Sequence, residues 1–183
     1  MNVIIAGIQG SGKGTQSKLI AEKYGLDHIS VGDCIYKYFT LDPSFVLPYT
    51  LEKYKSGELA PNDIVIKVAS KEVNSSKGYI LDGYPRQMAQ LESIADFDSK
   101  IDMTIILDLT ESQCYDRLIG RGRSDDTETG INKRISSYNT FTYPILQLLE
   151  RYGNVYHIDT SKSVDDVFNE ICDIIEKYKL MKI

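Results

Sequence analysis

Short apolar runs alternate with longer stretches of helical spacing along the whole chain. Five of the runs are short and rich in β-branched residues: 2–6, 27–30, 79–81, 103–107 and 155–158. Each is followed by a stretch in which apolar residues recur at helical intervals, and this alternation is typical of βαβ units with parallel strands. The run at 103–107 is almost continuously apolar, as expected for a strand that is buried on both faces. The pattern therefore predicts an α/β fold built on a parallel sheet.

Two helical patterns and one irregular region complete this outline. Apolar residues at a spacing of about 3.6 from Val164 to Tyr178 predict a C-terminal helix with one apolar face. A second helical pattern covers residues 131–152, and Pro144 is expected to bend it because proline has no backbone N–H to donate. Residues 40–61 contain three prolines and little strand character, so we expect them to leave the sheet.

The composition indicates one compact domain. The chain has 183 residues, 42% of them hydrophobic, and its length lies in the range of about 100–200 residues for a single domain. Its net charge of −5 argues against a nucleic-acid-binding surface or a polybasic membrane patch. No apolar run approaches the roughly 18 residues of a membrane span, and residues 1–6 lack the basic start of a signal peptide.

The three cysteines, Cys34, Cys114 and Cys172, are far apart in the sequence. Their spacing fits no metal site, and an odd number cannot complete a disulfide framework. We therefore expect small buried thiols and a reducing compartment, the cytoplasm.

The clearest chemical motif lies at residues 7–15, which read G-I-Q-G-S-G-K-G-T between a predicted strand and a predicted helix. This is the G-x-x-x-x-G-K pattern of a phosphate-binding loop, in which backbone N–H groups and a helix N-terminus point at phosphates. A merely tight turn would need neither the four glycines nor Lys13. Because Gly14 occupies the place of the usual Ser or Thr, we expect Mg²⁺ to be held mainly through water and nucleotide oxygens.

Arginine is used unevenly. The chain has 15 lysines but six arginines, none before Arg86 and four between Arg117 and Arg134. Since the guanidinium group binds phosphates in a bidentate way, this clustering indicates an anion-binding role.

Three further motifs complete a resemblance to adenylate kinases and related nucleoside monophosphate kinases. Residues 28–33 (H-I-S-V-G-D) resemble the start of the family's monophosphate-binding region. Residues 82–86 (D-G-Y-P-R) resemble its signature, with Gln90 at the position of the adenine-reading glutamine. Residues 117–126 (R-L-I-G-R-G-R-S-D-D), followed by Arg134, resemble the lid. With the phosphate loop, the match runs almost end to end in the same order.

The resemblance implies a three-layer P-loop fold with a central five-stranded parallel sheet. It implies a single domain over residues 1–183, with a monophosphate-binding insertion at about 30–60 and a short lid at about 121–127. Such a lid is too short for a structural zinc subdomain. The implied activity is reversible transfer of the terminal phosphoryl of Mg-ATP to AMP, giving two ADP. We expect a monomer with no nucleic-acid or membrane partner.

The resemblance also assigns roles to individual residues. Fixed cations must balance the phosphates, because this reaction depends mostly on positioning and electrostatic stabilisation. The implied catalytic residues are Lys13, Arg86, Arg121, Arg123 and Arg134. The implied ATP-binding residues are Gly10, Ser11, Gly12, Lys13, Gly14, Thr15, Arg117, Arg121 and Lys162. The implied AMP-binding residues are Val31, Tyr36, Glu58, Leu59, Ala60, Gly83, Tyr84, Pro85, Arg86, Gln90, Arg123 and Arg134. Asp82 is expected to hold a Mg²⁺-bound water.

Two positions depart from the family pattern on the acceptor side. Tyr36, followed by Lys37, stands where an arginine usually grips the monophosphate, and Val31 replaces a threonine near the base. Gln90 favours adenine, yet a kinase for UMP or CMP is an alternative, and a regulatory module that binds nucleotides without turnover is another. The five charge-neutralising residues argue against the regulatory module.

Several polar residues also have simpler, structural interpretations. Asp125 and Asp126 are candidates for capping a helix that begins near Thr127, and Asp33 is a candidate for capping another. We interpret His28 and His157 as structural, and Arg151 as a favourable charge near a helix C-terminus.

Overall fold

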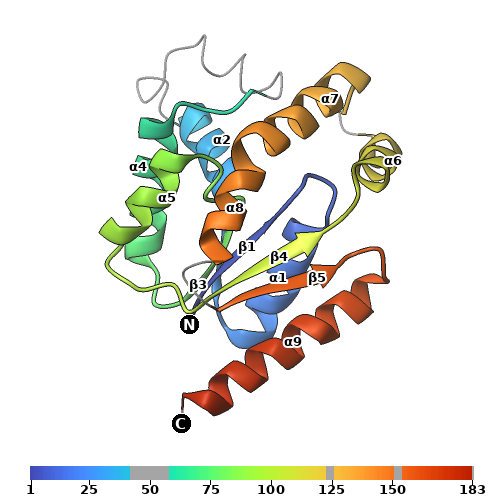
Figure 1. Ribbon diagram of the computed structural model, residues 1–183. Helices are drawn as coiled ribbons and strands as arrows, with labels where there is room; N and C mark the ends of the chain where they lie inside the picture. Colours follow the sequence, from blue (N-terminus) through green and yellow to red (C-terminus); the bar gives the residue numbers. More distant parts are fainter. Residues whose placement is uncertain (42–57, 123–125, 151–153, 183) are drawn as a thin grey trace.

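The computed structural model describes residues 1–41, 58–122, 126–150 and 154–182 (Figure 1). Five parallel strands form one sheet in the order β2-β3-β1-β4-β5. The strands are β1 (Asn2–Gly7), β2 (Asp27–Ser30), β3 (Tyr79–Asp82), β4 (Met103–Asp108) and β5 (Val155–Asp159). The predicted five-stranded parallel sheet is confirmed, and each strand lies within one residue of its expected bounds.

Helices fill the connections between the strands. The α-helices are α1 (Lys13–Tyr24), α2 (Val31–Leu41), α4 (Asn62–Ser75), α5 (Met88–Ser93), α6 (Glu111–Arg121), α7 (Glu128–Ser137), α8 (Tyr143–Leu149) and α9 (Val164–Met181). A 3₁₀ turn, η2 (Ile94–Asp96), follows α5, and a π-helical turn, η3 (Tyr138–Thr142), joins α7 to α8.

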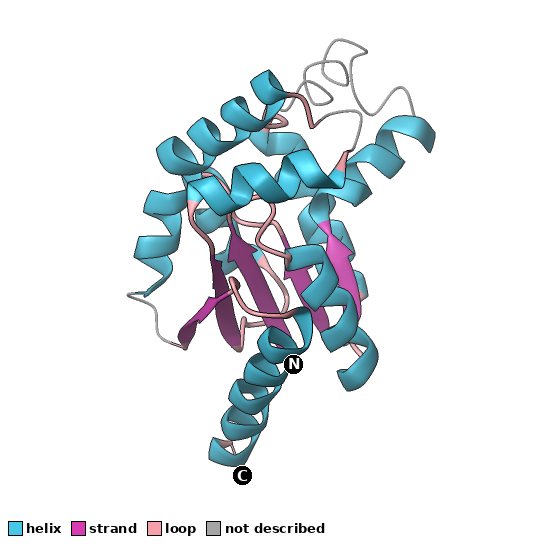
Figure 2. Cartoon of the chain, turned by 90° about the vertical axis from the view of Figure 1, so that its right-hand side faces the viewer, coloured by secondary structure: helices cyan, strands magenta, loops and turns pink. Residues whose placement is uncertain are grey.

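The sheet is buried on both faces, which makes three layers (Figure 2). Alternate residues of β1 point to opposite faces, so Val3 and Ile5 join one apolar cluster and Ile4 and Ala6 join the other. The first cluster is completed by α1 and α9, and the second by α2, α4 and α8. This two-sided burial explains the almost continuous apolar runs in the strands.

The predicted helix over 131–152 is interrupted where the sequence places Pro144. The π-helical turn precedes α8, and Pro144 lies in the first turn of α8, where a missing N–H costs no helical hydrogen bond. The end of the predicted pattern and Arg151 lie outside the described residues. So does most of the irregular 40–61 region, because residues 42–57 are not described.

The cysteines are free thiols, with Cys114 and Cys172 buried and Cys34 half-buried. Burial raises the pKa of the Cys34 and Cys114 thiols. Within the described ranges, no helix combines the length and the apolar character that a membrane crossing requires.

The parallel strands bring five loops to one edge of the sheet. The register pairs Ile5 with Asp82 and Gly7 with Leu107, so the loops that follow β1, β3 and β4 begin side by side. In Figure 1 the N-terminus lies at the lower end of the sheet and the C-terminus below it, both away from α6 and α7 in the upper right. Ligand sites of open parallel sheets lie at the carboxyl edge, next to the point where the strand order reverses.

Gly7 provides a test of how tightly this edge is packed. Its φ is +140°, and an added Cβ would lie 2.4 Å from the carbonyl oxygen of Leu107 in β4. We expect Gly7→Ala to lower the free energy of unfolding by about 1–3 kcal/mol, because both the conformation and the contact become strained. Gly120→Ala is the matched control, since an added Cβ there meets nothing within 4 Å and α6 should gain about 0.5–1 kcal/mol. Urea denaturation measures both, and a Gly7→Ala chain as stable as the unmodified one would contradict the packing described.

Candidate functional site

The phosphate-binding loop connects β1 to α1. Gly10 and Gly12 adopt φ of +83° and +90°, and the backbone N–H of Ser11 donates to the carbonyl of Ile8 at 3.2 Å. The loop rests on α6, because a Cβ at Gly10 would lie 3.3 Å from the carbonyl oxygen of Cys114. The predicted residues 10–15 are therefore gathered at the N-terminus of α1, where backbone N–H groups favour an anion.

Lys13 lies folded across this loop. Its Nζ donates to the carbonyl oxygens of Gly7 and Ile8, each at 2.8 Å. Burial lowers the pKa of Lys13 to about 8, the nearby Asp82 carboxylate raises it, and Arg86 and Arg121 lower it further. Arg86 and Arg121 are thus close enough to Lys13 to disfavour its charged form.

Asp82 ends β3 beside the start of α1. A Cβ added at Gly14 would lie 3.6 Å from its Oδ2, and His28 Nε2 lies 3.2 Å from the same oxygen. His28, which the sequence indicated only as structural, therefore contacts the carboxylate expected near the metal. Within the described ranges, no three His, Cys, Asp or Glu residues group into a metal site. A single carboxylate beside the loop fits an ion that phosphates and water hold for the most part.

The D-G-Y-P-R segment turns sharply after β3. The Tyr84–Pro85 peptide bond is cis, and Gly83 has a φ of +78°. Arg86 Nε donates to the carbonyl of Gly83 at 2.8 Å, so the guanidinium folds back over the turn. Gly83, Tyr84, Pro85 and Arg86 line a small cavity together with Gly7, Lys13, Gln9, Tyr138 and Thr142. The sequence predicted no place in the site for Gln9, Tyr138 or Thr142.

The lid arginines share one buried carboxylate. Arg121 binds Asp126 in a bidentate way, with Nε to Oδ2 at 2.8 Å and Nη2 to Oδ1 at 2.7 Å. Arg134 Nη1 donates to the same Oδ1 at 2.9 Å. The interpretation of Asp126 as a helix cap is wrong, because Thr127 caps α7 by accepting from the backbone N–H of Gly130. Arg123 and Asp125 lie outside the described residues.

Helices α6 and α7, which carry the lid arginines Arg121 and Arg134, pack on the phosphate-binding loop. Ile8 of the loop forms a small apolar cluster with Cys114 and Leu118 of α6 and Ile131 of α7. Arg117 and Arg121 stand four residues apart and therefore on the same face of α6. This cluster holds α6 and α7 against the phosphate-binding loop.

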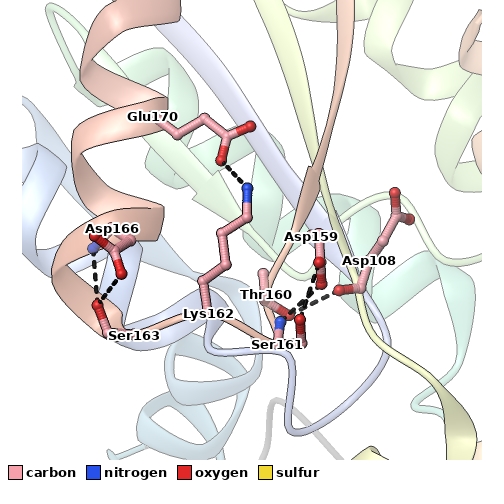
Figure 3. Close-up of polar contacts among 8 residues, drawn as sticks. All are labelled: Asp108, Asp159, Thr160, Ser161, Lys162, Ser163, Asp166 and Glu170. Carbon is pink, nitrogen blue, oxygen red and sulfur yellow. Dashed lines mark hydrogen bonds and ion pairs between the residues drawn. The ribbon is translucent and has the colours of Figure 1, made fainter.

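Arg117 joins the phosphate loop to the turn after β5. Its Nη1 donates to the carbonyl of Gly10 at 3.3 Å and its Nη2 to the carbonyl of Thr160 at 2.5 Å. Lys162 lies on the same turn, but its Nζ donates to Glu170 of α9 at 2.7 Å. Figure 3 shows this side chain extending to α9 rather than toward Asp108 at the end of β4. The structure therefore places Arg117, but not the ammonium of Lys162, in contact with the phosphate loop.

Besides the small cavity at the D-G-Y-P-R turn, expected acceptor residues line two further cavities. One is lined by Val31, Leu59, Ala60, Gly83, Arg86 and Gln90. Glu58 instead lines a separate cavity of about 500 Å³ with residues of α7. Tyr36 is 48% exposed and lines neither cavity.

Gln90 is held at its place in the cavity that it shares with Val31 and Ala60 by two hydrogen bonds. Its Oε1 accepts from the backbone N–H of Arg86 at 2.8 Å, and its Nε2 donates to Asn62 Oδ1 at 2.8 Å. Sequence reasoning missed Asn62, although it follows the expected segment 58–60 by two residues. Residue type alone gave no signal, because Asn at the start of a helix is ordinary.

Comparisons with known proteins agree with this geometry. The family model described as adenylate kinase matches residues 5–154. An adenylate kinase of Encephalitozoon cuniculi is 39% identical over 176 residues, which cover 95% of this chain and 97% of that protein. An adenylate kinase of Phocaeicola vulgatus is 35% identical, covering 97% and 99% of the two chains.

A human UMP-CMP kinase is 36% identical over 190 residues, covering 96% of each chain. The similarity therefore extends over nearly the whole length of enzymes with different acceptor bases. Together with the parallel sheet, the phosphate loop and the shared family model, these matches show that the chain belongs to the adenylate kinase family of P-loop, nucleotide-binding kinases, which transfer phosphoryl groups to nucleoside monophosphates.

Proposed function

We propose that this chain transfers the terminal phosphoryl of Mg-ATP reversibly to AMP, giving two ADP. The observation that carries the proposal is the convergence of Lys13, Arg86 and Arg121 near one another at the carboxyl edge of the sheet, beside an acceptor cavity that contains Gln90. Gly83 and Arg86 line both the small cavity at the phosphate loop and that acceptor cavity.

In this reaction no side chain of the protein needs to form a covalent bond with the transferred phosphoryl group. An ionised acceptor phosphate needs no general base, so the barrier falls mainly through positioning and charge stabilisation. The Lys13 ammonium faces the transferred group from the loop, and Arg86, Arg121 and Arg134 neutralise charge that builds on it. Arg123 is proposed to join them. A bound Mg²⁺ would neutralise part of the phosphate charge, and Asp82, at the end of β3 beside the phosphate loop, would hold one of its waters.

The remaining donor residues are proposed to hold ATP. Residues 10–15 wrap the phosphates, and the guanidinium of Arg117 supports the base side of the site from α6. Lys162 could reach that side only by breaking its hydrogen bond to Glu170, so we expect it to contribute less to ATP binding than Arg117 does.

The acceptor is proposed to be AMP because Gln90 offers both a donor and an acceptor to a base edge. Val31, Leu59 and Ala60 supply apolar walls, and Gly83 to Arg86 supply the phosphate side. Tyr36 and Glu58 were expected here too, and they would have to approach from outside the cavity. The second candidate acceptor is UMP or CMP, which the similarity to UMP-CMP kinases favours.

We also propose a single domain over residues 1–183, with a monophosphate-binding insertion at about 30–60 and a short lid at about 121–127. A short lid over the nucleotide would help to exclude water from the transferred phosphoryl. We propose a monomer that acts in the cytoplasm on ATP, AMP and ADP and binds neither nucleic acid nor membranes.

Lys13 should be indispensable for turnover but not for folding. We expect Lys13→Met to lower kcat by about 10²–10³, the usual cost of removing one preorganised charge donor. Lys18→Met is the matched control, because Lys18 is exposed on the same helix and should leave kcat unchanged. A coupled assay measures both, and activity of Lys13→Met within tenfold of the unmodified chain would remove Lys13 from the mechanism.

The affinity for ATP should fall in alkaline solution. Because burial lowers the pKa of Lys13 to about 8, raising the pH through this value discharges an ammonium that the phosphates need. The expected loss is up to about tenfold between pH of about 7 and 9, and it should be absent in Lys13→Met. Titration calorimetry at fixed ionic strength measures it, and an equal loss in Lys13→Met would assign the effect to another group.

The acceptor base can be measured directly. With saturating Mg-ATP, we expect kcat/KM for AMP to exceed that for UMP and CMP by at least about tenfold, because a site built to bond one base edge leaves its buried groups unpaired with another. Higher kcat/KM for UMP or CMP would establish the second candidate, and nucleotide binding without any turnover would establish a regulatory module.

A further inference from the structure

The orientation of the Gln90 amide is fixed by its neighbours. Gln90 is 2% exposed and lines the acceptor cavity. The backbone N–H of Arg86 donates to its Oε1 at 2.8 Å, and a backbone N–H can only donate, so the oxygen end must face Arg86. The nitrogen end then faces Asn62, which must accept through Oδ1, as the 2.8 Å contact shows.

This arrangement leaves a defined pair of bonding positions. A primary amide offers two acceptor positions on oxygen and two N–H donors on nitrogen. Arg86 takes one of the former and Asn62 one of the latter, so one acceptor and one donor remain for a ligand. The two partners determine which end of the amide presents the acceptor and which presents the donor.

An amide without such partners would read bases less selectively. Its oxygen and NH₂ ends have nearly the same size, so rotation by about 180° exchanges donor and acceptor at little steric cost. Adenine carries an exocyclic amino donor next to a ring-nitrogen acceptor, whereas a 6-oxopurine carries a carbonyl acceptor at the same place. A fixed amide therefore distinguishes two bases of almost identical shape, and a rotating one does not.

We propose that Asn62 is a positioning residue that gives the acceptor site its preference for 6-aminopurine over 6-oxopurine monophosphates. The inference rests on the proposed function of this cavity as the acceptor site. Asn62 begins α4 directly after Pro61, and Gln90 lies on α5, which packs against α4. The start of α4 therefore sets where the accepting oxygen lies, and this oxygen adds to the Arg86 N–H in holding the amide in one orientation.

The roles of the two partners differ in a testable way. Asn62 acts only as an acceptor toward Gln90, so Asn62→Asp should preserve the orientation, since a carboxylate also accepts. Asn62→Leu, of similar size, and Asn62→Ala remove the acceptor and leave Arg86 as the remaining partner of the amide. Asn74→Leu is the matched control, because Asn74 is exposed on the same helix and its Oδ1 accepts from Asp98 instead.

The experiment measures the dissociation constants of AMP and IMP by titration calorimetry for the unmodified chain and these four variants. In Asn62→Leu and Asn62→Ala we expect the preference for AMP over IMP to fall about three- to tenfold, the weight of one hydrogen bond. Asn62→Asp and Asn74→Leu should keep the preference within twofold. Across these variants, changes in the preference for AMP over IMP should not correlate with changes in the KM for ATP or in the melting temperature.

Three results would overturn the proposal: an unmodified chain that binds IMP as tightly as AMP, an unchanged preference in the folded Leu and Ala variants, or an equal loss in Asn62→Asp. Turnover of AMP by the unmodified chain is measured separately. Because binding preference tests Asn62 and turnover tests the proposed function, either one can fail without the other.

Discussion

The organisation of the site depends on the contacts of the half-buried Lys13 side chain with the phosphate loop. The side chain lies across the phosphate loop on two backbone carbonyls, and the surroundings lower its pKa to about 8. A cation in such a desolvated place is costly, and the two carbonyls and the Asp82 carboxylate offset part of that cost. In the proposed reaction, bound phosphates would further favour the charged form of Lys13, which Arg86 and Arg121 disfavour.

The lid also brings charged groups together, with Asp126 as the shared carboxylate. Its buried carboxylate binds Arg121 and Arg134 together, which positions two guanidinium groups before any nucleotide is bound. A bidentate contact holds a guanidinium in one orientation more firmly than a single hydrogen bond. Replacement of only one partner would leave the other charge buried and unpaired, so this group of three residues must act as a unit.

Much of the fold could be predicted from the sequence because periodicity reports burial directly. The strand at 103–107 was recognisable since both faces of β4 are buried, and the glycines and Lys13 identified the loop. The π-helical turn at 138–142 was not predictable, because Pro144 indicates an interruption but not the form it takes.

The site was less predictable wherever a role depends on partners distant in sequence. Asp126 looks like a helix cap in the sequence, yet Thr127 fills that role and Asp126 binds arginines on two helices. Lys162 and Tyr36 were expected at the site from their positions in the chain, but Lys162 is bound to Glu170 and Tyr36 is about half exposed. Asn62 carries no sequence signal at all, because its role exists only through Gln90.

We propose that this chain has two nucleotide sites, both suited to adenine, on either side of one group of cations. The most direct measurement is incubation with ADP and Mg²⁺ alone, followed by separation of the nucleotides. Two ADP molecules must then occupy the donor and acceptor sites together. We expect ATP and AMP to form in equal amounts until equilibrium is reached. Unchanged ADP, in the presence of a folded chain that binds ADP, would contradict the proposal of two adenine nucleotide sites.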